Sequence, residues 1–285
     1  MWLRVSLFAF LVTLSAPAAD GPLPLAKDYY DRTLYAESLK VLLPLQEKDA
    51  RVNELIGRNY FMQNDFKKAT EYFEKCVAAE PNNSQYYHWL GRTYGRRAET
   101  SSVFTAPQYA SKARQNFERA VQLNPKNAEA LNDLFEYYLQ APGFLGGGMD
   151  KAAALVEKIA ALDPAEQYYA KARIAEEKKE FQTAEVALRR AAELAPMQIG
   201  RLIDLGKFLA QRGKLQESEA AFARAEKIDA KSPKLLIERA ETYINTGQNL
   251  PAAKRLLEMY LKSELSPEDR PKEEARRLLA KIKGA

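Results

Sequence analysis

Apolar side chains recur three and four positions apart along most of the chain, which is the spacing of one face of a helix. One short pattern returns in the same form: an apolar residue, a small residue and, three positions later, a large apolar residue. It spans Ile56–Tyr60, Leu90–Tyr94 and Leu205–Leu209, and Gly57 and Gly91 stand 34 residues apart. This interval predicts a repeated helical unit.

Each unit has a second pattern, in which a small residue is followed by an apolar one four positions later and by a closing proline. The most complete copies are Ala69–Pro81, Ala113–Pro125, Ala152–Pro164 and Ala184–Pro196. Small residues let neighbouring helix backbones approach closely, and a helix cannot continue through proline. One helical hairpin cannot bury its apolar face alone, so the pattern predicts hairpins that stack on one another.

The two patterns together resemble the tetratricopeptide repeat, which carries Trp-Leu-Gly-Tyr positions on its first helix and Ala-Phe-Ala-Pro positions on its second. The resemblance extends over about six units and nearly all of the chain after residue 18. It implies an all-α fold, a right-handed α-solenoid of stacked helix-turn-helix repeats. It also implies a non-catalytic surface that holds other proteins.

Departures from the period divide the chain into segments. We expect an N-terminal partial repeat at 19–49, the repeat array at 50–264 and a C-terminal capping helix at 265–285. Two intervals between closing prolines exceed the period, which places insertions near 100–108 and 141–149. Insertions in a solenoid project from one edge, so both should lie at the same corner of adjacent hairpins.

The N-terminus has the order of a secretory signal. Arg4 precedes the apolar run Val5–Leu14, and the small residues Ala16 and Ala18 follow. This order predicts a signal peptide at 1–18 that is cleaved after Ala18, and therefore a periplasmic or secreted protein. The run is about half of the ~20 residues that span a bilayer, so we expect no membrane span after cleavage.

The composition limits the chemistry further. His88 and Cys76 are the only histidine and cysteine, which disfavours zinc sites and excludes an intramolecular disulfide. Cys76 occupies a slot that alanine fills in sister repeats, so we expect a small buried residue there rather than a reactive thiol. The net charge is +5 without a basic cluster, so we expect no nucleic-acid partner. We also expect no cofactor.

The glycine-rich stretch Gly143–Gly148 invites comparison with a phosphate-binding loop. Such a loop requires Lys and Ser or Thr directly after its last glycine, whereas Met149 and Asp150 follow here. We therefore expect a structural connection in which Asp150 caps the next helix.

The resemblance also implies a binding groove, because such proteins build their inner surface from fixed positions of the first helix. The residues at these positions in the first three repeats include Arg51, Arg58, Phe61, Gln85, His88, Trp89, Arg92, Arg96, Glu129, Asp133 and Glu136. The groove would run from basic and aromatic to acidic, and Arg and Trp are frequent anchors of interfaces. Alternatively, Trp89 packs beneath the first insertion and the arginines pair with Glu99 or with the acidic third repeat.

Some tetratricopeptide proteins grip an acidic C-terminal peptide with a clamp of Lys and Asn, Asn, then Lys and Arg. The matching positions here hold Glu54 and Arg58, Trp89, then Glu129 and Asp133. The clamp is therefore not expected.

These observations predict an adaptor or scaffold of the cell envelope that binds a protein partner, as a peptide or helix, in its groove. A self-associating structural subunit of an envelope complex is the alternative. An enzyme is disfavoured, because the sequence shows no catalytic constellation. The residues specify neither the partner nor the oligomeric state.

Overall fold

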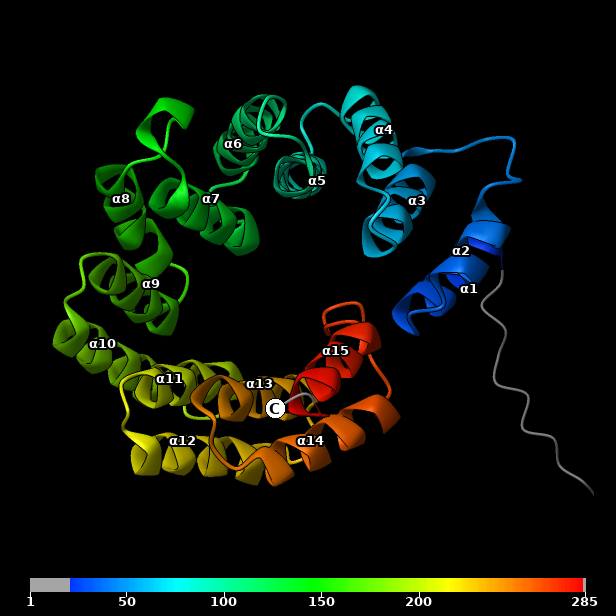
Figure 1. The fold of residues 1–285 in the computed structure, drawn as a ribbon. Helices are drawn as coiled ribbons and strands as arrows, with labels where there is room; N and C mark the ends of the chain where they lie inside the picture. Colours follow the sequence, from blue (N-terminus) through cyan, green and yellow to red (C-terminus); the bar gives the residue numbers. More distant parts are fainter. Residues whose placement is uncertain (1–20, 284–285) are drawn as a thin grey trace, which may run out of the picture.

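A computed structural model describes residues 21–283, so the signal peptide expected at 1–18 lies outside the described residues. Fifteen α-helices and one short 3-10 helix, with no strand, make up the described part (Figure 1). The helices are α1 (Pro22–Asp31), α2 (Tyr35–Leu42), α3 (Ala50–Met62), α4 (Phe66–Ala79), α5 (Ser84–Thr100), α6 (Ala106–Leu123), α7 (Ala128–Gln140), η1 (Gly143–Leu145), α8 (Met149–Ala160), α9 (Pro164–Glu177), α10 (Phe181–Leu194), α11 (Ile199–Gln211), α12 (Leu215–Ile228), α13 (Pro233–Thr246), α14 (Leu250–Lys262) and α15 (Lys272–Lys283). The expected all-α solenoid is confirmed.

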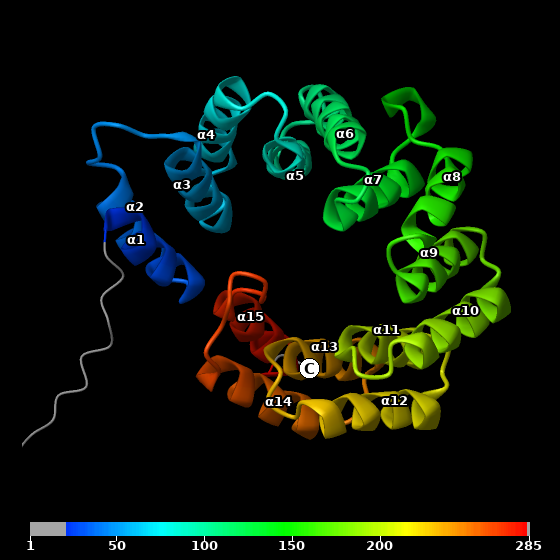
Figure 2. The same ribbon diagram turned by 180° about the vertical axis from the view of Figure 1, so that it is seen from behind.

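Consecutive helix pairs follow one another around a nearly closed ring (Figures 1 and 2). The odd-numbered helices from α3 to α13 line the inside, and their even-numbered partners lie outside. The pair α1–α2 and the helices α14–α15 face each other across the remaining gap, where residues of both ends line a cleft of about 930 Å³. The inner surface is thus formed by the first helix of each repeat.

The repeated small residues have a direct packing role. In three repeats a glycine of the first helix lies against a phenylalanine ring of the second helix. The pairs are Gly57 with Phe73, Gly91 with Phe117 and Gly206 with Phe222. A Cβ atom at any of these glycines would lie 2.6 to 3.0 Å from the ring, which is closer than packed carbon atoms approach. The glycine of the first pattern and the phenylalanine of the second are therefore coupled, because the ring occupies the space that a side chain in place of the glycine would need.

Alanine at Gly91 should destabilise the protein by about 1–3 kcal/mol, the usual cost of overpacking a core. Its Cβ would lie 2.6 Å from Cδ1 of Phe117, which is itself buried. Alanine at Gly95, one turn later on α5, meets no atom within 4 Å. That change should stabilise by up to about 1 kcal/mol through helix propensity. Urea denaturation of both variants checks this, and stability changes of the same sign would contradict it.

The first insertion lengthens helices rather than a loop. Helices α5 and α6 contain 17 and 18 residues, compared with 13 and 14 in the preceding hairpin of α3 and α4. Only 101–105 connect them. Four extra residues extend a helix by about 6 Å, so this hairpin projects by one turn beyond its neighbour.

The second insertion forms the connection between α7 and α8. It holds η1, and α8 begins at Met149 with Gly148 at its N-cap position. The expectation that Asp150 caps α8 is wrong, because glycine brings the backbone into the helix two residues earlier. Asp150 instead lies in the first turn, where a negative charge interacts favourably with the helix dipole.

Cys76 is fully buried, as expected from its slot in the repeat. Its thiol donates to the carbonyl oxygen of Ala50 at 3.4 Å, and burial raises the pKa of this thiol to about 12. The residue therefore belongs to the core. Among residues 21–283, none of the helices combines the length and the apolar composition that crossing a bilayer requires.

Candidate functional site on the inner surface

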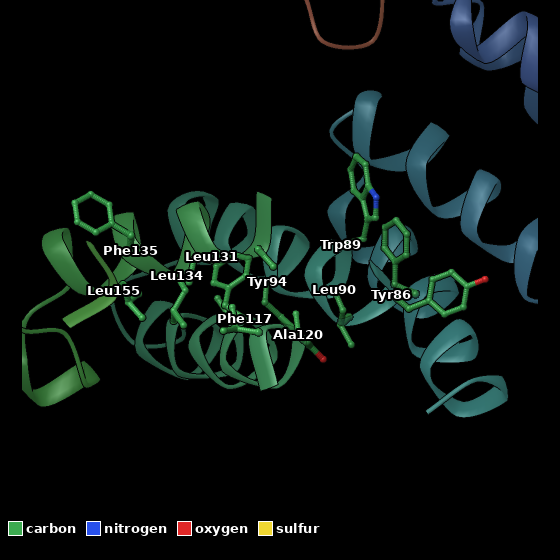
Figure 3. Packing of buried hydrophobic residues seen from close by; sticks show 14 of the residues in the cluster. Tyr86, Trp89, Leu90, Tyr94, Phe117, Ala120, Leu131, Leu134, Phe135 and Leu155 are labelled. Carbon is green, nitrogen blue, oxygen red and sulfur yellow. The ribbon is translucent and has the colours of Figure 1, made fainter. Parts of the chain in front are cut away.

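Trp89 lies within the packing, with 5% of its surface exposed, and belongs to the buried cluster drawn in Figure 3. Its ring stacks on Phe73 with the centroids 5.7 Å apart and makes an edge contact with Phe61 at 5.5 Å. The guanidinium carbons of Arg58 and Arg92 lie 4.7 and 4.6 Å from its ring centroid. These cation–π contacts are stabilising. Trp89 therefore belongs to the core beneath the inner surface, and the side chains of Arg58 and Arg92 cover its ring.

His88 joins the second repeat to the third. It is completely buried, and its Nε2 lies 2.8 Å from Oδ2 of Asp133 on α7. Glu129 lies 3.7 Å from its Nδ1, and Arg92 lies 3.9 Å from Asp133. The basic second repeat and the acidic third repeat thus pair directly.

Three further predicted residues lie near the ends of their helices. Arg51 pairs at 2.8 Å with Asp49, which caps α3, and Gln85 lies at the start of α5. Arg96 lies with its guanidinium carbon 5.3 Å from the ring centroid of Phe66. It is half-exposed and pairs with Glu99, as the alternative interpretation of the arginines predicts.

A series of ion pairs continues this arrangement beyond the third repeat, each joining the inner helices of successive repeats. The pairs are Glu136 with Arg173, Glu166 with Arg201 and Lys207 with Glu238. The partners are 31 to 37 residues apart in sequence, close to the repeat period. Residues of opposite charge about one repeat apart were the sequence signal from which these pairs could have been predicted. These contacts fix the spacing between neighbouring inner helices.

Two adjoining hollows open on the inner surface. The first, which we call the apolar hollow, has a volume of about 440 Å³ and lies between the α5–α6 hairpin, α7 and the α7–α8 connection. Its apolar part is formed by Phe61, Ala110, Phe117, Tyr137, Ala141, Pro142 and Leu145. Arg92 and Arg96 line it from α5, and Asp133 and Glu136 line it from α7. It can receive an apolar side chain between groups of opposite charge.

The second, which we call the polar hollow, has a volume of about 470 Å³ and lies between α7, α9 and α11. Its polar lining includes Glu166, Tyr169, Arg173, Glu176, Asp204, Lys207 and Gln211. Asp133, Glu136 and Gln140 line both hollows. The two hollows therefore adjoin at these three residues, and we refer to them together as the groove.

Burial shapes the charge of the polar hollow. It raises the pKa of the Asp204 carboxyl, against the opposing effect of Arg201, and it also raises the pKa of the Tyr169 hydroxyl. Burial opposes the charged form of each group. A cationic group of a ligand placed beside Asp204 would offset this cost.

Some of the predicted residues meet in this groove and others do not. Those that line the apolar hollow are Phe61, Arg92, Arg96, Asp133 and Glu136. The remaining ones, Arg51, Arg58, Gln85, His88, Trp89 and Glu129, line neither hollow. The polar hollow escaped the sequence reasoning, which followed the inner positions only to the third repeat. The same positions of the fourth and fifth repeats hold Arg173, Asp204 and Lys207.

Family models of the tetratricopeptide repeat match residues 50–83 and 165–196. The chain is a tetratricopeptide-repeat protein. The matched segments coincide with α3–α4 and α9–α10, on either side of the two insertions. A search of curated proteins found no significant relative.

Solved structures of low sequence identity share the fold of this tetratricopeptide-repeat protein. A tetratricopeptide repeat protein of Parabacteroides merdae is 14% identical, with a TM-score of 0.60 over 92% of this chain and 97% of that one. A thermophilic protein of Thermus thermophilus is 21% identical, with a TM-score of 0.54 over 66% and 97%. Human IFIT1, a dimer with PPP-AAAA, is 19% identical, with a TM-score of 0.56 over 85% of this chain and 54% of that one. Tetratricopeptide repeats are in general interaction modules without catalysis.

Proposed function

We propose that this protein is a non-catalytic scaffold or adaptor of the periplasm or cell envelope that holds a segment of a protein partner in the groove formed by the two adjoining hollows. The signal-like order of residues 1–18 supports the location. The repeats support the class of function.

The observation that carries the proposal is the junction of the two hollows at Asp133, Glu136 and Gln140. An apolar compartment beside a polar one suits a peptide that presents side chains of both kinds. Recognition sites commonly combine apolar lining with a few placed polar groups. The ion pairs between repeats hold the inner helices in place, and preorganisation of this kind reduces the entropy lost on binding.

Trp89 and His88 have an indirect role in this proposal. Both are buried, so neither provides the contact surface that the sequence first suggested. They contact Arg92 and Asp133, which line the apolar hollow from α5 and α7. The groove residues to alter are therefore the more exposed ones.

The double variant Arg96→Glu, Gln140→Arg should lose capture of envelope proteins by at least about tenfold, which corresponds to about 1.4 kcal/mol of binding free energy. It reverses a charge of the apolar hollow and places a long side chain where the hollows join. Quantitative cross-linking pull-downs from envelope extracts measure the loss. Arg190→Glu, a half-exposed position on α10 that lines neither hollow, is the control and should capture the same proteins as the wild type.

The alternative of a self-associating structural subunit is separable from this proposal. Val186 on α10 and Met197 after it are 68% and 72% exposed, and apolar side chains of this kind can form contacts between copies. Self-association would raise the molar mass with protein concentration in light scattering. A constant monomer mass together with groove-dependent capture would favour the scaffold.

A further inference from the structure

We propose that the two insertions are raised rims of the binding groove, and that they contact an amphipathic helix of the partner through the exposed side chains of Val103, Phe104 and Phe144. This proposal rests on the proposed function and names the kind of partner. It adds a contact surface outside the inner positions of the repeat.

The three side chains are the most exposed large apolar residues of the described chain. Phe104 is 90% exposed, Phe144 is 83% exposed and Val103 is 80% exposed. All three lie in the two segments that interrupt the repeat period, at the α5–α6 connection and in η1. Exposed apolar side chains of this size mark contact sites when they gather around one feature.

The first rim is the projecting hairpin. Its tip, 101–105, carries Val103 and Phe104 one helical turn beyond the neighbouring hairpin, a distance of about 6 Å. A longer hairpin buries no additional core at its tip, since both side chains point into solvent. The extension therefore creates an apolar edge.

The second rim is a fixed loop rather than a loose one. The amide of Gly148 donates to the carbonyl oxygen of Tyr138 at 2.8 Å, and the hydroxyl of Tyr137 donates to that of Leu145 at 2.9 Å. Gly146 has a φ of 84° and lies against the Arg114 side chain of α6. The loop thus holds Phe144 outward on a defined support.

The two rims stand on either side of the apolar hollow. Arg96, Glu99 and Ala110 line it from the hairpin, and Pro142 and Leu145 line it from the loop. Helix α6 and η1 are also in contact with each other. Val103, Phe104 and Phe144 belong to these two segments but lie outside the lining itself, so a partner would reach them only by extending beyond the hollow.

An amphipathic helix matches these features. Its apolar stripe, with anchors at i, i+3, i+4 and i+7, would cover the rims and the apolar part of the hollow. Its flanking charges would meet Arg92 and Arg96 on one side and Asp133 and Glu136 on the other. A bilayer could cover the rim side chains but would remove water from these four charged side chains, which pair with one another or with His88, Glu99 and Arg173. The geometry therefore favours a protein helix, which can present polar groups to them.

The test places the photo-crosslinking amino acid p-benzoylphenylalanine at Phe104, Phe144, Gln140 or Val186 of the full chain in its own cells. We expect adducts from positions 104, 144 and 140 on one segment of one partner. The modified residues of that segment should be spaced by three, four or seven positions. Position 186, outside the groove, should give at most one tenth of that yield.

The outcomes separate the two proposals. Adducts at 140 without adducts at 104 and 144 would overturn the rims and leave the groove. An absence of adducts at all three positions would overturn both. Adducts of positions 104 and 144 with phospholipid would show that the rims contact a membrane instead of a partner helix. Adducts with a second copy of this chain would show self-association. Adducts with many unrelated proteins would show non-specific contact.

Discussion

Alanine at Gly147 should destabilise the protein by about 3 kcal/mol, in the upper range for single substitutions. A Cβ atom there would lie 1.8 Å from the carbonyl oxygen of Ala141 and 2.5 Å from its carbonyl carbon. A backbone atom cannot rotate away as a side chain can. The connection between α7 and α8 would therefore have to open, with loss of the hydrogen bond between Gly147 and Pro142. Urea denaturation followed by circular dichroism measures the change.

The matched control lies four residues earlier in the same loop. Alanine at Gly143 meets no atom within 4 Å, and its stability should remain within about 0.5 kcal/mol of the wild type. Similar losses for both variants would show that the loss at Gly147 does not come from the contact with Ala141. A neutral Gly147→Ala variant would show that the loop is not held as described.

Alanine at Trp89 should cost about 3–5 kcal/mol, as for other large aromatic residues removed from a core. The change opens a cavity beside Phe73 and removes the ring on which Arg58 and Arg92 rest. Trp89→Phe keeps a ring at the site and should lose less than half as much. Thermal denaturation of the two variants measures both effects.

This prediction also separates the two roles that the sequence left open for Trp89. A core residue loses stability when truncated, whereas an exposed anchor loses binding. Val186→Ala, at an exposed position of α10, is the control and should change stability by less than about 0.5 kcal/mol. A stable Trp89→Ala variant that fails to capture a partner would make Trp89 a contact residue.

The repeat architecture could be predicted from sequence because the packing rule is local and recurrent. Gly91 and Phe117 lie on the first and second helix of one repeat and meet in space, as Gly57 and Phe73 do in the preceding repeat. The same contact recurs in several repeats, so the solenoid could be predicted from several independent copies of one pattern.

The candidate site was less predictable, because it depends on the insertions that depart from the repeat period and on which side chains are buried. Position alone placed Trp89 on the inner surface, but burial depends on its neighbours Phe61, Arg58 and Arg92. Extra residues near 100–108 could equally have formed a loop, and only the structure shows that they extend both helices. The polar hollow needs pairs such as Glu166 with Arg201, whose side-chain geometry the sequence does not give.

The central claim is that a partner segment lies where the two hollows join. A cysteine at Gln140, modified with a bulky maleimide, tests it most directly, because the buried thiol of Cys76 should not react. The modified Gln140→Cys protein should lose partner capture by at least about tenfold relative to its unmodified form. The modified Val186→Cys protein should be unaffected. Undiminished capture by the modified Gln140→Cys protein would contradict the claim.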